Sequence, residues 1–206
     1  MFSILDTPTY WDELYLNKAT GWDLKKPNPV WAELIDKQEF IKPDKLLITG
    51  CGYGYDAVYA AKSGFEVTAV DFSKYAISRA QEYARDELLN VKFIPDNLFN
   101  LGKEYIGKFD TVYEYTTYCA INPERRAEYI AKICSYIKPG GKLIAVLFPV
   151  DGRKGGPPFN VDIDTFYKQA KKHLKLEFFS RQINSVEPRK GKEILQIYNK
   201  PKKPVL

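Results

Sequence analysis

The sequence predicts an α/β fold: a doubly wound, mostly parallel sheet of seven strands that ends in an antiparallel hairpin. Three observations predict it. From residue 46 onward, β-rich runs alternate with helical segments; the first run ends in a glycine-rich turn; and the last two runs follow each other without an obvious helix between them. Alternating strands and helices form right-handed βαβ units with parallel strands, whereas strands joined without a helix pair as a hairpin.

Each expected strand is a short run rich in apolar or β-branched residues. The strands are expected at Lys45–Thr49, Phe65–Val70, Val91–Ile94, Phe109–Tyr113, Lys142–Phe148, Leu174–Arg181 and Glu193–Tyr198. Helices are expected over Asp56–Lys62, from the N-cap Ser73 to about Arg85, from Pro123 to about Ile137, and over 162–172. Pro139-Gly140-Gly141 is expected to be a turn before the fifth strand.

The first 45 residues differ from the rest. They hold all three tryptophans, Trp11, Trp22 and Trp31, together with several tyrosines and prolines. Aromatic density without strand alternation predicts a short helix and a loop lying over the body. We therefore expect one domain, residues 1–206, with a lid at 1–45 and an α/β body at 46–206.

The composition excludes several classes of protein. Apolar residues make up 45% and charged residues 28% of the 206, an ordinary globular balance. The longest apolar run, Leu143–Val150, has eight residues, far fewer than the roughly 18–20 of a membrane span. The N-terminus lacks the basic lead of a signal peptide. Three cysteines are too few for a disulfide framework, so we expect a cytoplasmic setting.

Histidine and charge restrict the chemistry further. The only histidine, His173, leaves hardly room for a Ser-His-Asp triad, and we expect no metal site. The net charge of +5 resides in residues 181–206, which hold seven basic and two acidic residues. The aromatic residues are not interleaved with these charges in the way a stacking platform would require, which favours a solvated C-terminal edge and tail. We expect a monomer with neither nucleic acid nor membrane as partner.

The most informative segment is Leu46–Asp71, LLITGCGYGYDAVYAAKSGFEVTAVD. A buried strand ends in the glycine turn Gly50–Gly54, a helix follows, and a second strand ends in the acid Asp71. Glycines allow a sharp turn and close approach of the backbone to a ligand, and an acid at this place can accept hydrogen bonds from two ribose hydroxyls. Open α/β sheets bind ligands at the carboxyl ends of their strands. The segment predicts an adenosine-type site.

This segment has three possible interpretations: a site for S-adenosylmethionine, a site for NAD(P), or a turn that binds no ligand. Gly52-x-Gly54-x-x-Ala57 also fits the dinucleotide fingerprint, which places a pyrophosphate at the helix N-terminus. Asp56 in the first turn of that helix is unfavourable for phosphates but suits the ammonium and sulfonium groups of S-adenosylmethionine. S-adenosylmethionine is favoured over NAD(P) and over a turn without a ligand.

Four segments in this order resemble the thiopurine methyltransferase superfamily of class I S-adenosylmethionine-dependent methyltransferases, in particular its thiol/halide branch. They are the aromatic segment YWDELYLNKATGWDLKKPNP from Tyr10, the glycine turn with Asp71, FDTVYEYTTYCAINPERR over Phe109–Arg126, and FPVDGRKGGPPFNV over Phe148–Val161. The resemblance spans about residues 10–165. It implies a Rossmann-like methyltransferase sheet, an aromatic lid and methyl transfer to a small soft nucleophile.

The resemblance also implies roles for individual residues. Those implied to bind the cofactor are Trp11, Tyr15 and Trp22 in the lid, Gly50 and Gly52 at the methionine moiety, Asp71 at the ribose, Asp96 and Asn97 at the adenine, and Glu114, where the family more often has Asp, at the methionine amino group. Tyr15 replaces a frequent tryptophan. Core packing is the alternative for the lid aromatics.

The acceptor pocket is expected between Tyr115–Cys119, Arg126 and the loop Asp151–Phe159. Tyr115 and Tyr118 could line it or donate a hydrogen bond to an anion, although packing at the strand end is equally compatible. Arg126 matches the family's arginine, Arg153 lies in the loop, and Phe159 replaces a frequent tyrosine. Cys51 and Cys119 are better interpreted as small buried residues than as nucleophiles.

Thiols, sulfide, halides, thiocyanate and thiopurines need no strong general base, because a usable anionic fraction exists near neutrality or the acceptor is already an anion. This agrees with the absence of histidine from every motif. An O- or N-methyltransferase of a small metabolite, a nicotinamide-dependent oxidoreductase and a non-catalytic adenosine-binding module remain alternatives.

Overall fold

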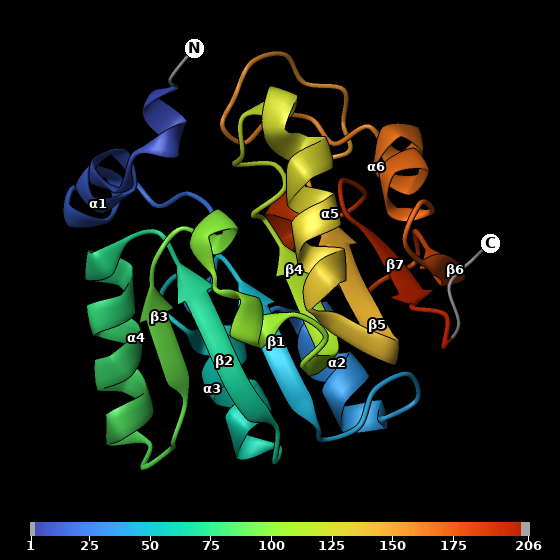
Figure 1. Ribbon diagram of the computed structural model, residues 1–206. Coiled ribbons are helices and arrows are strands. Elements are labelled where there is room, and N and C mark those ends of the chain that lie inside the picture. The colour runs from blue at the N-terminus through green and yellow to red at the C-terminus, as the bar shows by residue number, and fades with distance from the viewer. Residues whose placement is uncertain (1–2, 203–206) are drawn as a thin grey trace. The chain divides into compact units, whose positions relative to one another are not determined.

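The computed structural model describes residues 3–202 (Figure 1). The chain divides into two compact units, Met1–Leu101 and Gly102–Leu206. No helix within the described residues is long and apolar enough to cross a membrane.

The N-terminal unit contains three parallel strands in the order β3-β2-β1: β1 (Lys45–Thr49), β2 (Glu66–Asp71) and β3 (Lys92–Pro95). Helices α3 (Tyr55–Lys62) and α4 (Lys74–Asp86) connect them. Ser73 caps α4 as predicted, since its hydroxyl oxygen accepts a hydrogen bond from the Ala76 N–H. In the β2–β3 register Asp71 pairs with Pro95, so the segments that follow both strands begin at the same edge.

Two helices precede the sheet where the sequence predicted one. Helix α1 (Pro8–Leu16) packs on α4, and α2 (Pro29–Lys37) packs on α3. The start of α2 carries two signals that the sequence analysis missed: Asn28, whose side chain accepts from the N–H groups of Val30 and Trp31, and Pro29 in the first turn. Trp31 is fully buried, so it belongs to the core.

The C-terminal unit contains four strands in the order β4-β5-β7-β6. Strands β4 (Phe109–Tyr115) and β5 (Ile137–Leu147) are parallel; β7 (Ile194–Asn199) runs antiparallel to β5 and to β6 (Lys175–Ser180). The helices are α5 (Arg126–Tyr136) and α6 (Ile163–Ala170), and short 3-10 turns lie at Ile4–Asp6 and Leu98–Asn100 in the first unit and at Lys103–Tyr105, Pro123–Arg125 and Glu187–Arg189 in the second. The hairpin and the mostly parallel character of the seven strands are confirmed.

The prediction of a turn at Pro139-Gly140-Gly141 was wrong. These residues lie inside β5, which begins five residues earlier than predicted, and the β4–β5 register shifts between Phe109 and Thr111. A Cβ on Gly141 would lie 2.6 Å from the Asp110 carbonyl oxygen. The glycine therefore forms a bulge within the strand, where two backbones approach closely.

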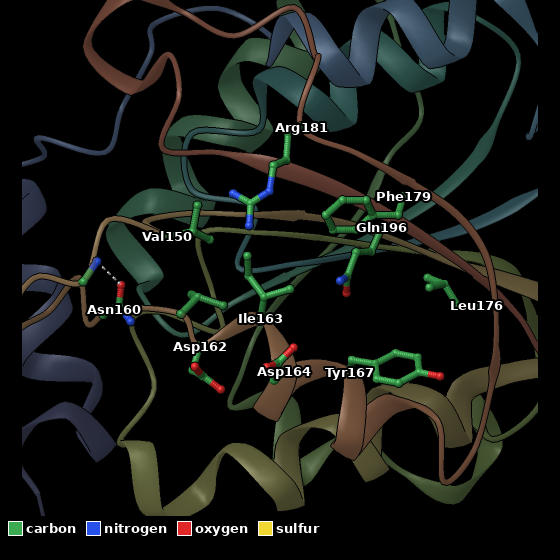
Figure 2. Close-up of a pocket in the computed structure, with 12 residues that line it drawn as sticks. Val150, Asn160, Asp162, Ile163, Asp164, Tyr167, Leu176, Phe179, Arg181 and Gln196 are labelled. Carbon is green, nitrogen blue, oxygen red and sulfur yellow. Dashed lines mark hydrogen bonds between the residues drawn. The ribbon is translucent and has the colours of Figure 1, made fainter.

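A groove of about 560 Å³ lies in the C-terminal unit (Figure 2). Asp162, Asp164 and Tyr167 from the start of α6 line one side, and Phe179, Arg181 and Gln196 from the β6–β7 hairpin region line the other. Gly152, from the loop Asp151–Phe159 that the sequence predicts to border the acceptor pocket, lines this groove, but none of the individually predicted site residues does.

Candidate active site

The glycine turn follows β1 and needs its glycines for physical reasons. Gly50, Gly52 and Gly54 have φ values of 58°, 52° and 81°, in the left-handed region. A Cβ on Gly52 would lie 3.0 Å from the Tyr15 hydroxyl, and one on Gly54 would lie 2.8 Å from the Ala80 Cβ. The turn is thus closed on one side by the lid helix and on the other by α4.

Asp71 lies beside this turn, as predicted. Its Oδ2 accepts from the Gly52 N–H at 2.7 Å and its Oδ1 from the Ser73 N–H at 2.9 Å. The residue is 8% exposed, and burial raises the pKa of its carboxyl to about 6, against the opposing effect of these hydrogen bonds. The carboxylate is held in place and poorly solvated, so new donors such as ribose hydroxyls would stabilise its charge.

The three predicted lid aromatics form one cluster. The Trp22 indole N–H donates to the Tyr15 hydroxyl at 3.2 Å, and edge-to-face contacts join Tyr15 to Trp22 at 5.5 Å and Trp11 to Trp22 at 5.9 Å between ring centroids. Tyr15 is buried, whereas Trp11 and Trp22 are half-buried. The two tryptophans keep ring surface that a ligand could cover.

Asp12 anchors the lid helix. Its Oδ1 accepts from the Ser73 hydroxyl at 2.5 Å and from the Tyr75 N–H at 3.1 Å, at the first turn of α4. Ser73 also donates its N–H to Asp71. The lid and the predicted ribose acid therefore share one fixed residue.

The pair predicted to read adenine follows β3, and both residues are half-buried. The Asn97 side-chain oxygen accepts from the Phe99 N–H at 3.0 Å and caps the 3-10 helix Leu98–Asn100. Asp96 accepts from the Asn97 N–H at 2.6 Å. Local capping thus fixes the direction of both side chains.

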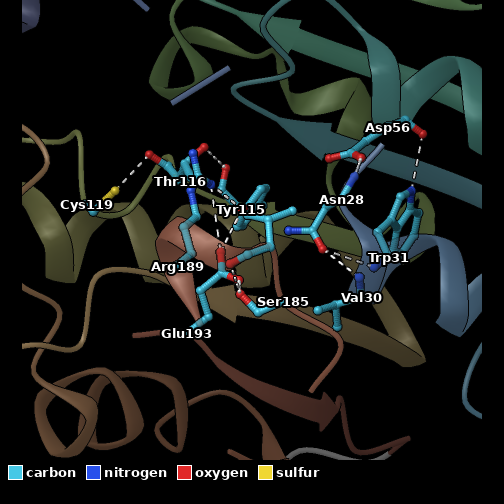
Figure 3. Close-up of polar contacts among 11 residues, drawn as sticks. Asn28, Val30, Trp31, Asp56, Tyr115, Thr116, Cys119, Ser185, Arg189 and Glu193 are labelled. Atoms are coloured by element: carbon cyan, nitrogen blue, oxygen red, sulfur yellow. Dashed lines mark hydrogen bonds and ion pairs between the residues drawn. The ribbon is translucent and has the colours of Figure 1, made fainter. Parts of the chain in front are cut away.

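Asp56 lies in the first turn of α3, as predicted when S-adenosylmethionine was favoured over NAD(P). Its Oδ1 accepts from the Asn28 N–H at 2.7 Å, and its carbonyl accepts from the Trp31 indole at 3.2 Å (Figure 3). A carboxylate in this turn disfavours a pyrophosphate. The glycine cradle, the poorly solvated Asp71 and the acidic helix start fit S-adenosylmethionine.

In the C-terminal unit, Glu114 and Tyr115 end β4. Glu114 is fully buried; its Oε1 accepts from the Tyr118 N–H at 2.8 Å and its Oε2 from the Tyr129 hydroxyl. Tyr118 is also buried, and its hydroxyl donates to Gln169 Oε1 at 2.9 Å. That donor is already used, which favours the packing interpretation of Tyr118.

Arg126 is held from several sides. Its Nε donates to the Tyr118 carbonyl and its Nη1 to the Asn160 carbonyl, both at 3.0 Å, and the guanidinium carbon lies 4.5 Å from the centroid of the Tyr118 ring and 5.9 Å from that of Phe159. Among the described residues, its buried Nη2 has no hydrogen-bond partner. The Phe159 N–H donates to the Cys119 carbonyl at 2.8 Å. The predicted strand end, arginine and loop thus meet.

Unlike Arg126, Arg153 is bonded mainly to a residue of its own loop. It makes a two-point ion pair with Asp151, with its Nε and Nη2 at 2.9 and 2.7 Å from the carboxylate oxygens, which lowers the pKa of Asp151 to about 2. Its guanidinium carbon lies 5.5 Å from the Phe148 ring centroid.

The structure adds residues that the sequence analysis missed. Arg189 and Glu193, assigned to a solvated edge, are 4% and 2% exposed, so that interpretation was wrong for both. The Tyr115 hydroxyl donates to Glu193 Oε1 at 2.7 Å, Arg189 donates to the Tyr115 oxygen, and the Ser185 hydroxyl donates to Glu193 Oε2 (Figure 3). The position of Glu193 directly before an apolar strand was the available signal.

The pKa of Cys119 reflects the charged groups near the end of β4. Burial and the charge of Glu114 raise the pKa of its thiol to about 12, while the charges of Arg126 and Arg189 oppose the rise. Arg126, Arg189 and Glu114 therefore lie within electrostatic reach of the Cys119 thiol, where burial and the carboxylate outweigh the two arginines.

Comparisons with known proteins agree on the family. The family model described as thiopurine S-methyltransferase matches residues 6–201. A probable thiol methyltransferase 2 of Arabidopsis thaliana is 36% identical over 92% of this chain and 84% of that protein. Thiocyanate methyltransferase 1 of the same plant is 28% identical over the same shares, and the thiopurine S-methyltransferase of Bos taurus is 26% identical over 73% and 70%.

Solved structures share the fold. A structure from work on the conversion of a disulfide bond into a thioacetal group in echinomycin biosynthesis has a TM-score of 0.80 at 20% identity, covering 96% of this chain and 94% of that one. The 1,6-didemethyltoxoflavin N1-methyltransferase of Burkholderia thailandensis, with bound S-adenosylhomocysteine, has a TM-score of 0.76 at 19% identity over 94% and 87%. The chain belongs to the thiopurine S-methyltransferase family, and it is an S-adenosylmethionine-dependent methyltransferase of small nucleophiles.

Proposed function

We propose that this enzyme is an S-methyltransferase whose acceptor is a small soft nucleophile: a thiol, sulfide, thiocyanate, a halide or a thiopurine. The observation that carries the proposal is the buried Nη2 of Arg126, which has no hydrogen-bond partner among the described residues and offers a charged donor to a nucleophile that reacts as an anion. The family relatives named for thiols and thiocyanate support the same class.

On the cofactor side, Asp71 would accept hydrogen bonds from the ribose, Asp96 and Asn97 would bind the adenine, and Trp11, Tyr15 and Trp22 would cover the ligand. Gly50 and Gly52 would lie against the methionine moiety, and Glu114 would pair with its ammonium. When bound, the cofactor supplies an electrophilic methyl group and a neutral leaving sulfur. The chain itself then has to exclude water and orient the acceptor.

On the acceptor side, Arg126 supplies a buried N–H group that no described residue accepts, and Arg189 supplies a second cation. Tyr115 and Phe159 would form walls, and Arg153 would act at the rim. Among the predicted acceptor residues, Tyr118 has the least support, because its hydroxyl is bonded to Gln169.

The test combines calorimetry and turnover. S-adenosylhomocysteine should bind and NADH should not. Labelled S-adenosylmethionine should methylate at least one member of a panel of thiols, sulfide, iodide, thiocyanate and a thiopurine. Turnover of only phenols, alcohols or amines would favour the alternative of an O- or N-methyltransferase. Cofactor binding without any turnover would favour a non-catalytic adenosine-binding module.

We further propose one catalytic domain, residues 1–206, that acts as a cytoplasmic monomer on a small molecule without nucleic acid or membrane. The family match across both units supports a single functional domain. Cys51, Cys119 and Cys134 are free thiols, which supports a reducing setting. Light scattering after size exclusion would test the monomer.

A further inference from the structure

The groove of about 560 Å³ in the C-terminal unit has the size of a small-molecule site, for which about 300–1,000 Å³ is usual (Figure 2). None of the residues proposed to bind the cofactor lines it. Part of its wall is apolar, with Ile163 from α6 and Leu176 and Phe179 from β6. Phe179 is 43% exposed. A ligand that covers these side chains would remove apolar surface from water, which favours binding.

One side of the groove carries negative charge. Asp162 caps α6 and Asp164 lies in its first turn. Asp162 Oδ1 accepts from the Thr165 N–H at 2.7 Å, and the hydrogen bonds with Thr165, with a contribution from the charge of Lys168, lower the pKa of the Asp162 carboxyl. Neither aspartate forms an ion pair with any residue that the structure describes. Acids are ordinary at a helix N-terminus, so this side alone does not indicate a ligand.

The opposite side carries a cation. Arg181 follows β6, and Figure 2 shows its guanidinium pointing into the groove from the side facing Asp164. Within residues 3–202 it forms no ion pair, and its guanidinium carbon lies 5.9 Å from the centroid of the Phe179 ring. The groove therefore holds opposite charges on two walls that are not paired with each other.

Gln196, on β7, gives the independent indication of a ligand. The residue is 2% exposed, and its side-chain oxygen accepts from the Tyr198 hydroxyl at 2.6 Å. Its amide nitrogen donates to none of the described residues, and Figure 2 shows the amide turned into the groove. A buried amide that lacks an acceptor costs free energy. A ligand carbonyl in the groove would supply that acceptor.

We propose that this groove binds a zwitterion of dipeptide size with apolar side chains. Its ammonium would pair with Asp162 and Asp164, and its carboxylate would pair with Arg181. The peptide carbonyl would accept from the Gln196 amide, while the apolar side chains would cover Phe179 and its neighbours. The inference goes beyond the proposed function and does not depend on methyl transfer.

Two features favour a dipeptide over a free amino acid. An amino acid carries its ammonium and carboxylate on one carbon, whereas the aspartates and Arg181 lie on opposite sides of the groove. An amino acid also lacks a neutral carbonyl for Gln196, since both of its oxygens belong to the carboxylate. A peptide bond separates the two charges and supplies the carbonyl between them.

Leucyl-leucine and its analogues test the proposal by NMR titration of the protein. N-acetylation removes the ammonium, C-terminal amidation removes the carboxylate, and glycyl-glycine keeps both charges but lacks apolar side chains. We expect saturable binding of leucyl-leucine and about fivefold weaker binding of the acetylated and amidated forms, the size of an exposed ion pair. Glycyl-glycine should bind more weakly than leucyl-leucine.

Two results of this series would overturn the proposal. One is the absence of saturable binding of leucyl-leucine at about 10 mM, ten times a weak dissociation constant of about 1 mM. The other is equal affinity for leucyl-leucine and for its doubly blocked form, N-acetyl-leucyl-leucine amide, which would indicate an apolar site without charge recognition.

Two variants assign the charges. Arg181→Gln should weaken binding of leucyl-leucine about fivefold but leave binding of its amide unchanged, because the amide has no carboxylate. Asp164→Asn should weaken leucyl-leucine but not the N-acetyl form. Both side chains belong to exposed residues, so the fold should persist. Glu177→Gln is the matched control, since Glu177 lies on β6, pairs with Lys142 and does not line the groove. Equal losses for every ligand would contradict the assigned charges.

The side-chain amide of Gln196 reports where the dipeptide binds. Its NMR signal should shift on titration, whereas that of Gln169 should not, because Gln169 bonds to Tyr118 and does not line the groove. Gln196→Glu identifies the signal, since it removes the amide nitrogen but keeps an oxygen for the Tyr198 hydroxyl. An unchanged Gln196 signal at saturation would place the dipeptide elsewhere and overturn the proposal.

Discussion

The backbone N–H of Gly52 donates to Oδ2 of Asp71 at 2.7 Å, which ties the turn after β1 to the carboxylate at the end of β2. The two residues are 19 positions apart, yet this contact makes them one structural unit. The loop that would approach the cofactor and the acid that would bind its ribose therefore cannot be changed independently.

Asp71→Ala should weaken binding of S-adenosylhomocysteine by about tenfold or more, because hydrogen bonds to a charged group contribute roughly 1.5–3 kcal/mol. Isothermal calorimetry measures the affinity, and a melting curve shows whether the variant is folded. Asp86→Ala, at a 74% exposed side chain, is the control. A folded Asp71→Ala protein with wild-type affinity would refute the ribose assignment.

Cofactor affinity should depend on pH through Asp71. Burial raises the pKa of its carboxyl to about 6 in the free protein. Ribose hydroxyls donate to the ionised form, so binding lowers this pKa and releases a proton. Affinity should be constant above about pH 7 and fall as the pH drops through about 6, approaching tenfold per pH unit. Calorimetry in buffers of different ionisation enthalpy should detect the released proton. Affinity that stays flat between about pH 5 and 8 contradicts an ionised ribose acid with this pKa.

The raised pKa of Asp71 also makes the free energy of unfolding depend on pH. Stability should rise over the pH range in which cofactor affinity falls. The folded state holds the Asp71 proton more tightly than the unfolded chain does, so burying the charge costs free energy above about pH 6. That cost is relieved as the pH falls toward the unfolded value of about 4. Asp71→Asn removes this contribution, so the free energy of unfolding of the variant should depend less on pH over that interval in urea titrations.

The two tryptophans Trp22 and Trp31 separate a lid residue from a core residue. Trp31 is fully buried, and Trp31→Ala should cost roughly 3–5 kcal/mol of stability. Trp22 is half-buried and contacts Trp11 and Tyr15, so Trp22→Ala should chiefly raise the cofactor dissociation constant. Urea unfolding and calorimetry on both variants test the contrast. A loss of stability of equal size in both would place Trp22 in the core.

Much of this fold could be predicted because the local signals agreed with the tertiary structure. The glycine turn, the cap at Ser73 and the final hairpin follow from turn chemistry, helix capping and the absence of a linking helix. The bulge at Gly140-Gly141 could not, since the same residues suit a turn, and only the neighbouring strand shows that β5 continues through them.

The residues proposed for the cofactor side could be named from the sequence, whereas Arg189 and Glu193, which lie beside the proposed acceptor residue Tyr115, could not. Asp71 and the glycines are near in sequence and belong to one βαβ unit. Tyr115 and Glu193 are 78 positions apart and meet only through tertiary packing. A charged residue in a basic segment looks solvated until its burial is known, which is why Arg189 and Glu193 were missed.

Arg126 should set the preference for negatively charged acceptors. Two of its nitrogens donate to the carbonyls of Tyr118 and Asn160, and the buried Nη2 has no partner among the described residues. Burial also lowers the pKa of the guanidinium, which marks a poorly solvated cation that an anion would stabilise. Arg126→Gln removes the charge, so KM for a thiol that carries a carboxylate should rise about tenfold relative to KM for a neutral thiol. Arg125→Gln, at the neighbouring residue whose side chain pairs with Glu128 at the surface, is the matched control.

The ratio of the two KM values distinguishes a loss of anion recognition from structural damage in Arg126→Gln. Damage to the packing around the lost carbonyl contacts would raise both KM values together. Equal increases for the charged and the neutral thiol would assign Arg126 to the framework of the loop and leave Arg189 as the cation that the acceptor meets.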